Sequence, residues 1–277
     1  MPLPLLPVAH FMSHPVHTVH EANDVADVDQ RMVAHGVSSL LVTDVHGNPR
    51  GVVSRFDLIR VGRLRARTSG GSTLLELPSQ AVSRVMHRDV ISVAADATVP
   101  QAAARMVDRG VHRVFVLDGA RVVGVLSTRD VMRAVEAARI ESPIEQWMSS
   151  PVIDVASTDP VEVATDRLGQ SRVTGVVVLE NGWPVGLYTQ REALAASGLP
   201  PETPVDRVMT YALLCLPVET TVFRAAGLTA ATRARRVLVV EKREVRGILT
   251  GLDFARVLLE ADASSKPDAP AGRDVRT

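Results

Sequence analysis

The chain has 277 residues, of which 46% are hydrophobic and only 3% are aromatic. It carries 31 Lys and Arg against 31 Asp and Glu, so its formal net charge at pH 7 is zero. A neutral chain with few aromatic side chains lacks both the electrostatic field and the stacking surfaces typical of nucleic-acid-binding proteins. Nucleic acid is therefore not expected as a partner.

Three further features narrow the class of protein. A single cysteine, Cys215, excludes an internal disulfide framework and Cys-rich zinc sites. No apolar run approaches the roughly 18 residues that span a bilayer, and residues 1–11 are broken by three prolines and lack the basic region of a secretion signal. We therefore expect a cytoplasmic protein without a membrane partner. Residues 263–277 are small, polar and proline-containing, which predicts a disordered tail.

Four landmarks recur along the chain at nearly constant spacing. Each copy has a methionine, a valine 13 residues later, a glycine 38 residues later and an acid 44 residues later, with one extra residue before the glycine in the first copy. The methionines are Met12, Met86, Met148 and Met209, the valines Val25, Val99, Val161 and Val222, the glycines Gly51, Gly124, Gly186 and Gly247, and the acids Asp57, Asp130, Glu192 and Asp253. Agreement at four positions in four copies indicates an internal repeat.

Within each copy the pattern predicts the same order of elements. A short strand follows the methionine, then an amphipathic helix, two strands joined by a tight turn, and a second helix that begins near the acid. Asp118-Gly119 and Asn181-Gly182 are strong hairpin signals. We predict an α/β (α+β) fold of four β-α-β-β-α repeats at 8–68, 82–140, 144–200 and 205–262, with a flexible loop at 69–81. Because a unit of about 60 residues cannot cover both faces of its sheet, the repeats should pack as two pseudo-two-fold pairs.

The strand-to-helix corner reads GVVSRFD, GVLSTRD, GLYTQRE and GILTGLD in the four copies. A hydroxyl residue followed three positions later by an acid is the capping box of a helix N-terminus. The same atoms suit a ligand, because a helix start attracts phosphate and an aspartate can accept both hydroxyls of a ribose. Both interpretations stay open, and aspartate in the first, second and fourth copies favours ligand sites there.

A second variable position lies just before the middle strand of each repeat. Odd copies have small residues there and even copies have basic ones: Ser38-Ser39, His112-Arg113, Thr174-Gly175 and Arg235-Arg236. Arginine is well shaped for phosphate, so a pair of repeats would place phosphate-binding cations opposite a wall without bulky side chains. The alternative is that these are exposed charges at strand starts.

Together these motifs resemble tandem cystathionine-β-synthase-type (CBS) domains over residues 9–260, with VHTV and VISV as the best matches to the family's first strand. The four-copy plan is similar to that of the γ subunit of AMP-activated protein kinase. The resemblance implies a regulatory module, not an enzyme, whose repeats pair and bind AMP, ADP, ATP or a related adenosyl ligand between them. We also expect no required cofactor and no metal, because the residues show no nucleophile–base pairing and no Gly-rich phosphate loop.

The resemblance also assigns site residues. It implies that Asp57 and Asp130 hold ribose, that Ser54 and Ser127 lie beside the phosphates, and that Thr18 and Ser92 face the ligand from the first strand. The favoured cleft combines residues of the first two copies: Thr18, Ser38, Ser39, His112, Arg113, Ser127 and Asp130, with Arg129 as a further phosphate contact. In the second pair the corresponding residues are Arg235, Arg236, Thr250 and Asp253. That site is expected to be weaker, because Glu192, Asp154 and Cys215 depart from the family pattern.

Three functions remain open from the sequence. The first is a nucleotide-sensing module that acts on a separate regulated protein, with a homodimer also left open. The second is a ligand-free interaction scaffold whose corners are only helix caps. The third is an adaptor for RNA or another polyanion that uses Arg60, Arg63, Arg65 and Arg67. A metal site at His10, His14, His17 and His20 is not expected, because Pro15 and an alternating strand place these side chains on different faces.

Overall fold

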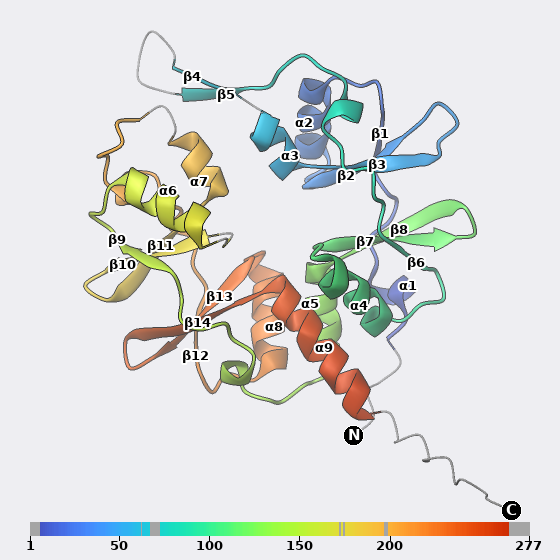
Figure 1. Cartoon of the computed structure of the whole chain (residues 1–277). Helices are drawn as coiled ribbons and strands as arrows, with labels where there is room; N and C mark the ends of the chain where they lie inside the picture. Colours follow the sequence, from blue (N-terminus) through green and yellow to red (C-terminus); the bar gives the residue numbers. More distant parts are fainter. Residues whose placement is uncertain are drawn as a thin grey trace, which may run out of the picture.

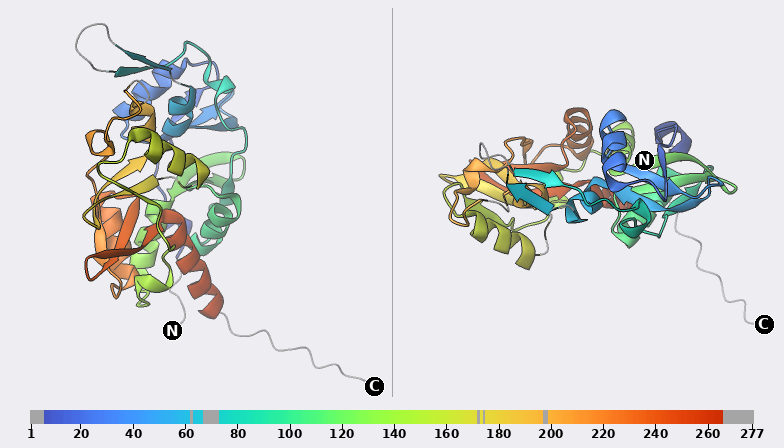
Figure 2. Two further views of the ribbon diagram at one scale, coloured as in Figure 1. Left: turned by 60° about the vertical axis from the view of Figure 1, so that its left-hand side comes forward. Right: turned by 90° about the horizontal axis from the view of Figure 1, so that it is seen from above.

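The computed structural model describes residues 6–61, 63–66, 73–171, 173, 175–196 and 199–265. It contains four three-stranded sheets, one per repeat, each flanked by two helices (Figure 1). The body is broad in Figure 1 and thin when seen from above (Figure 2), so the four repeats lie side by side in one layer. Most of the predicted tail, residues 266–277, lies outside the described ranges.

The predicted order of elements is found in every repeat. The first has α1 (Val8–Phe11), β1 (Thr18–His20), α2 (Val25–Ala34), β2 (Ser39–Thr43), β3 (Pro49–Ser54) and α3 (Arg55–Val61). The second has η1 (Val82–Arg84), β6 (Ser92–Ala94), α4 (Val99–Arg109), β7 (Arg113–Asp118), β8 (Arg121–Ser127) and α5 (Thr128–Ala137). The third has η2 (Ile144–Gln146), β9 (Asp154–Ala156), α6 (Val161–Gln170), β10 (Gly175–Glu180), β11 (Trp183–Thr189) and α7 (Gln190–Ala195). The fourth has η3 (Val205–Arg207), β12 (Cys215–Pro217), α8 (Val222–Thr232), β13 (Arg236–Glu241), β14 (Glu244–Thr250) and α9 (Gly251–Ser265).

Helix α4 shows how the local sequence sets these elements. Thr98 and Gln101 form a capping box at its start, and Gly110, with φ of 60°, ends it in the left-handed conformation. Its buried side chains include Ala102 and Met106, four residues apart on one face. The helical periodicity of the sequence therefore corresponds to the face that packs into the core.

All four sheets share one topology. The first strand runs parallel to the second, which is antiparallel to the third, as in the order β6-β7-β8. A bulge follows the residue that pairs with the recurring glycine, for example Val116 opposite Gly124. The same offset occurs at Gly51, Gly186 and Gly247. The glycine landmark therefore marks one fixed position on the third strand of each sheet, opposite the bulge.

The methionine of each repeat packs on the glycine of its partner repeat. A Cβ atom added at any of these glycines would come closer than 3 Å to the Sδ of a methionine: Gly51 to Met86, Gly124 to Met12, Gly186 to Met209 and Gly247 to Met148. The next residues then form reciprocal backbone bridges, Ser13 with Val125 and His87 with Val52. Ser149 with Ile248 and Thr210 with Leu187 repeat this in the second pair. The repeats therefore form the predicted pairs, 1 with 2 and 3 with 4.

The short helix before each methionine lies on the partner repeat rather than on its own. Val8 of α1 is buried in the core that contains α4 and α5, whereas Val82 of η1 is buried in the core of the first repeat. In the second pair, Ile144 is buried with the fourth repeat and Val205 with the third. Each pair is therefore held together by exchange of its leading segments.

The two pairs meet through the helices of the even repeats. One hydrophobic core joins α4 and α5 to α8 and α9, and it includes Met106, Val131, Phe254 and Leu258. Where α5 and α9 begin, a Cβ on Gly251 would lie 2.6 Å from the Cβ of Thr128, so only glycine allows this approach of the two helix starts. Repeats 1 and 3 instead have separate cores of their own. Figure 1 shows α5, α8 and α9 packed together between the second and fourth sheets.

The segment between the first two repeats differs in part from the expectation. The sequence suggested a flexible loop at 69–81, but β5 (Thr73–Glu76) pairs antiparallel with β4 (Arg63–Ala66). Arg67, one of the arginines considered for polyanion binding, lies outside the described residues. Among the helices that the structure describes, none has the length and apolar character of a membrane span.

Candidate functional site

The strand-to-helix corners are capping boxes. The Ser127 backbone N–H donates to Asp130 Oδ2 at 2.8 Å, and the Ser127 hydroxyl donates to the same oxygen at 2.7 Å. Ser54 with Asp57 and Thr250 with Asp253 repeat this geometry. In the third repeat the Thr189 N–H donates to Glu192 Oε2 at 3.2 Å. The structural interpretation of the corner is thus observed in all four repeats, and the three aspartates are buried.

The second oxygen of each aspartate faces a cation or an imidazole. Arg133 donates to Asp130 Oδ1 at 2.9 Å, and Arg256 makes the equivalent contact with Asp253 Oδ1. In the first repeat, His87 Nε2 lies 2.8 Å from Asp57 Oδ1. The sequence assigned these carboxylates to ribose, but in the structure both oxygens contact groups of the protein. A ribose that used this second oxygen would compete with Arg133, Arg256 or His87.

The first residue of the middle strand lies next to the strand-to-helix corner in every repeat. The register pairs Arg113 with Ser127 and Arg236 with Thr250 in the even repeats. In the odd repeats it pairs Ser39 with Ser54 and Gly175 with Thr189. Each basic residue is therefore the cross-strand neighbour of a corner hydroxyl, about 5 Å away. Cations and hydroxyls that are distant in sequence converge at the helix starts.

Cations from repeats 2 and 4 meet at the centre of the molecule. Partial burial lowers the pKa of His112, and the charges of Arg113, Arg235 and Arg236 lower it further. Burial, together with Arg235, lowers the pKa of Arg113 to about 10, although Asp57 opposes this shift. Burial and Arg235 also lower the pKa of Arg236, and Glu192 opposes the effect. We call His112, Arg113, Arg235 and Arg236 the central cation cluster.

The small residues of the odd repeats give these cations room. Arg113 donates to the Ser38 hydroxyl at 3.1 Å, which joins repeat 2 to repeat 1. The Arg236 guanidinium carbon lies only 3.3 Å from the position of a Cβ on Gly175, which joins repeat 4 to repeat 3. The predicted opposition of small and basic residues is therefore present in both pairs. Thr174 lies outside the described residues.

Other predicted residues are not brought to this cluster by any hydrogen bond that the described part of the chain shows. Thr18 is exposed at the start of β1, where Leu41 is its neighbour in register. Ser92 starts β6 beside Phe115, and Arg129 lies in the first turn of α5. Their roles stay predictions. Asp154 lines a cavity of about 360 Å³ between repeats 3 and 4, together with Met148 and Arg246.

Sequence reasoning missed the partners of the buried acids. Arg133 and Arg256 each follow their aspartate by three residues on a helix, a spacing that brings side chains together and could have been noticed. His87 follows Met86 directly, and only the exchange of leading segments brings it to Asp57. No local signal in the sequence could have revealed that contact. Within the described ranges, no three His, Cys, Asp or Glu residues are grouped as a metal site.

These observations define a class of protein. It is a module of two pseudo-symmetric pairs of β-α-β-β-α repeats, with helix starts and cations gathered at its centre. Comparison with protein families matches the CBS domain to residues 8–63, 82–137, 144–198 and 205–260. The chain belongs to the CBS domain family, whose members are generally regulatory.

Solved structures and curated relatives agree with this assignment. Protein MJ1225 of Methanocaldococcus jannaschii matches 91% of this chain and 99% of its own, with a TM-score of 0.71 and 14% identity. An uncharacterized conserved protein of Pyrococcus horikoshii matches 91% and 99%, with a TM-score of 0.66 and 21% identity. Both likenesses show the fold. The CBS domain-containing protein CBSCBSPB3 of Arabidopsis thaliana is 27% identical over 75% of this chain and 44% of the relative. A second Arabidopsis relative, CBSCBSPB2, is 25% identical and covered to 45%, so the chain spans less than half the length of these two relatives.

Proposed function

We propose that this chain is a regulatory module that binds an adenine nucleotide, with the nucleotide phosphate on the central cation cluster. The observation that carries the proposal is the convergence of His112, Arg113, Arg235 and Arg236, whose mutual repulsion and burial lower the pKa of three of them. Cations held in this way are stabilised by a polyanion that is complementary to them. The corner hydroxyls and helix starts beside them add hydrogen-bond donors for phosphate.

The position of the adenosyl part of the nucleotide is inferred from membership of the CBS domain family. The resemblance to CBS domains implies an adenosyl ligand between paired repeats, with its ribose on Asp130 or Asp57. A ribose bound at Asp130 would compete with Arg133 for Oδ1, and the released guanidinium would turn to solvent. Because Arg133 also donates to the Phe11 carbonyl oxygen at 2.8 Å, ribose binding would loosen the segment that repeat 1 contributes to repeat 2.

The contact between Arg133 and the Phe11 carbonyl oxygen links the ligand site to the packing of repeat 1 on repeat 2. A ligand that binds only one arrangement of the pairs stabilises it by RT ln(1 + [L]/Kd), about 2.7 kcal/mol at a hundredfold excess over Kd. This energy is sufficient to shift an equilibrium between two arrangements of the repeats about a hundredfold. We therefore infer that nucleotide occupancy changes the surface that a separate regulated protein contacts.

A ligand-free scaffold is the second candidate, and one observation favours it. Both carboxylate oxygens of Asp130, and likewise of Asp253, accept hydrogen bonds within the protein, so these corners are satisfied without a ligand. Nucleotide binding has to overcome these contacts. In each of these contacts the arginine is half exposed and the aspartate is buried, so the contact is worth about 1.5–3 kcal/mol, the scale of a hydrogen bond to a charged group. Several phosphate contacts of the same kind together exceed this value. The balance favours the nucleotide.

A thermal melt in AMP, ADP and ATP tests the proposal. We expect a rise in Tm with at least one nucleotide, and loss of that rise in Arg236→Met, which removes a partly buried cation of the cluster. Arg50→Met is the matched control, because Arg50 is half exposed on β3, pairs with Glu21 and lines neither cavity. If no adenine nucleotide shifts the melting of the wild type, the scaffold is the better description.

A further inference from the structure

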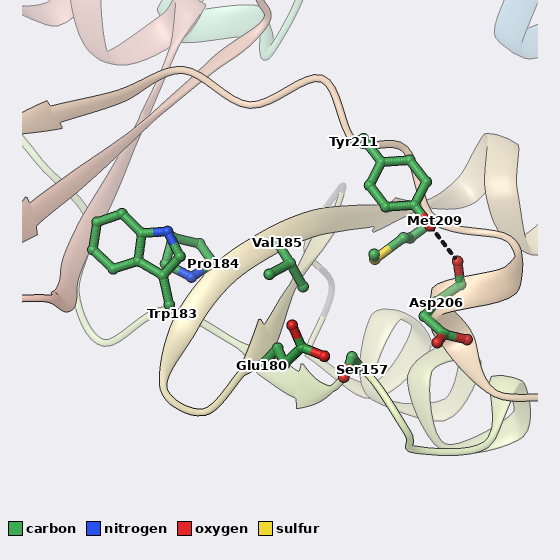
Figure 3. Close-up of a pocket in the computed structure, with 8 residues that line it drawn as sticks. All are labelled: Ser157, Glu180, Trp183, Pro184, Val185, Asp206, Met209 and Tyr211. Atoms are coloured by element: carbon green, nitrogen blue, oxygen red, sulfur yellow. Dashed lines mark hydrogen bonds between the residues drawn. The ribbon is translucent and has the colours of Figure 1, made fainter.

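A second cavity lies at the outer end of repeat 3 and is lined by different chemistry. It has a volume of about 370 Å³ and is formed by three segments: the β10–β11 hairpin, the turn after β9, and the linker that enters repeat 4 (Figure 3). Trp183 begins β11 and the corner residue Thr189 ends it, so the pocket lies about 20 Å along the strand from the corner. It is separate from the proposed phosphate site.

The charge of this pocket is opposite to that of the central cation cluster. Its lining includes Glu180 and Asp206 and contains no lysine, arginine or histidine. Asp206 Oδ1 is buried and has no hydrogen-bond partner in the described part of the chain. A buried carboxylate oxygen without a donor is unfavourable. The pocket therefore disfavours phosphate and favours a ligand that brings both positive charge and an N–H group.

Two aromatic side chains also line the cavity: Tyr211 lies close to Asp206, and Trp183 lies at the opposite end, beyond Val185 and Glu180 (Figure 3). Trp183 and Tyr211 are 37% and 69% exposed, among the few large hydrophobic side chains that the described residues leave at the surface. The Tyr211 hydroxyl donates to the Asp206 carbonyl oxygen at 3.1 Å, which holds the phenol ring close to the acid (Figure 3). Aromatic faces attract cations. Met209 and Val185 line the same cavity and supply an apolar surface for methylene groups.

The other repeats do not reproduce this combination. At the position equivalent to Trp183, where the third strand begins, repeat 2 has Arg121 and repeat 4 has Glu244, so neither offers an indole. Two residues after the methionine, where the linker has Tyr211, the other repeats have no aromatic ring of this kind: the residues are His14, Arg88 and Ser150. Since the repeat fold does not need these aromatic residues, a ligand is a better explanation for them than the scaffold.

We propose that this pocket binds the primary ammonium group of an organic amine, with its N–H groups directed to Asp206 and Glu180 and its methylene chain on Met209 and Val185. A primary ammonium supplies the donors that Asp206 Oδ1 lacks, which a quaternary ammonium cannot do. The same chemistry is present in a free aliphatic amine and in a lysine side chain of another protein. This proposal does not depend on nucleotide binding.

Calorimetry with 1,5-diaminopentane and with a capped Gly-Lys-Gly peptide tests the proposal, with Trp183 fluorescence as a second readout. We expect at least one of the two amines to bind and the neutral 1,5-pentanediol not to bind. Tighter binding of the diamine identifies a free amine as the ligand, and tighter binding of the peptide identifies a lysine side chain. Absence of binding by both amines at millimolar concentrations would overturn the proposal.

Variants then locate the site. Asp206→Asn should weaken amine binding at least tenfold, and Glu180→Gln, at an exposed position that folding does not require, should weaken it severalfold. The matched control is Glu145→Gln, which removes one charge from the equivalent position of the η2 turn, outside the pocket. Equal weakening in Asp206→Asn and Glu145→Gln would show only general electrostatic attraction, and the assignment of the pocket would be wrong.

Discussion

Repeats 2 and 4 differ from repeats 1 and 3 in both packing and charge. The even repeats share one hydrophobic core across α4, α5, α8 and α9, and they carry the central cations. The odd repeats have separate cores, and they place small residues opposite those cations. The central cations are thus carried by the two repeats that share one hydrophobic core. The odd repeats are joined to it through the methionine–glycine contacts and exchanged segments, which suits them to respond when a ligand binds.

The largest expected effect is a loss of stability when the contact between the helices of the even repeats is disrupted. Gly251→Val would force a side chain into Thr128 where α5 and α9 begin, and we expect a loss of about 3 kcal/mol from the free energy of unfolding. Gly169→Ala in α6 is the control, because a Cβ there meets nothing within 4 Å. That change should stabilise the chain by about 0.5–1 kcal/mol. Chemical denaturation measures both, and equal effects would contradict the close approach of the helices.

A smaller loss of stability should be confined to repeat 1 and leave the even repeats unchanged. Met86 is buried in the core of repeat 1 and packs on Gly51, so Met86→Ala should cost about 2 kcal/mol or more. Because that core is separate, amide exchange should quicken in α2 and β2 while α5 and α9 keep their protection. Val33→Ala, at an exposed position on α2, should change little. Uniform loss of protection in all four repeats would contradict this independence.

The third test concerns the aspartates of the strand-to-helix corners and the arginines that contact them. Arg133→Ala removes the group that occupies Asp130 Oδ1, so a ribose would meet less competition there. We expect nucleotide affinity to rise roughly tenfold, which corresponds to about 1.4 kcal/mol and is close to the scale of one hydrogen bond to a charged group. The control is Arg109→Ala, which breaks an exposed pair with Asp89 elsewhere in repeat 2. A large loss of affinity in Arg133→Ala would show that this arginine binds the ligand instead of competing with it.

The smallest effect concerns pH and His112. Burial and the neighbouring arginines lower its pKa in the free protein, whereas a bound phosphate would raise it, so binding should be accompanied by proton uptake. Nucleotide affinity should therefore rise about two- to threefold as pH falls from 8 to 6.5, and His112→Asn should abolish the change. Without ligand the sign is opposite: the lowered pKa makes the folded protein less stable as pH falls below the unfolded value of about 6.5. A calorimetric pH series measures the first effect.

The repeat architecture was largely predictable from the sequence. The spacing of Met, Gly and acid is strict because each methionine packs on a partner glycine at the bulge, and this contact requires the same register in every copy. The capping boxes and the opposition of small and basic residues were predictable for a similar reason, since both depend on fixed positions within one unit.

Features that depend on how the units meet were not predictable. His87 reaches Asp57 because the leading segments are exchanged, and Gly251 contacts Thr128 because two pairs pack together. The β4–β5 hairpin and the pocket beside Trp183 and Tyr211 fall outside the repeated pattern. Periodicity describes what the copies share, and these contacts are specific to one copy or one interface.

The central claim is that the even repeats present a phosphate receptor to the nucleotide. Calorimetry of AMP against adenosine at pH 7.5 tests it most directly, because the two ligands differ only in the phosphate. We predict that AMP binds at least tenfold more tightly than adenosine, a difference of about 1.4 kcal/mol or more, and that Arg113→Ala removes most of this preference. Equal affinity for the two ligands, or an unchanged preference in Arg113→Ala, would contradict the account.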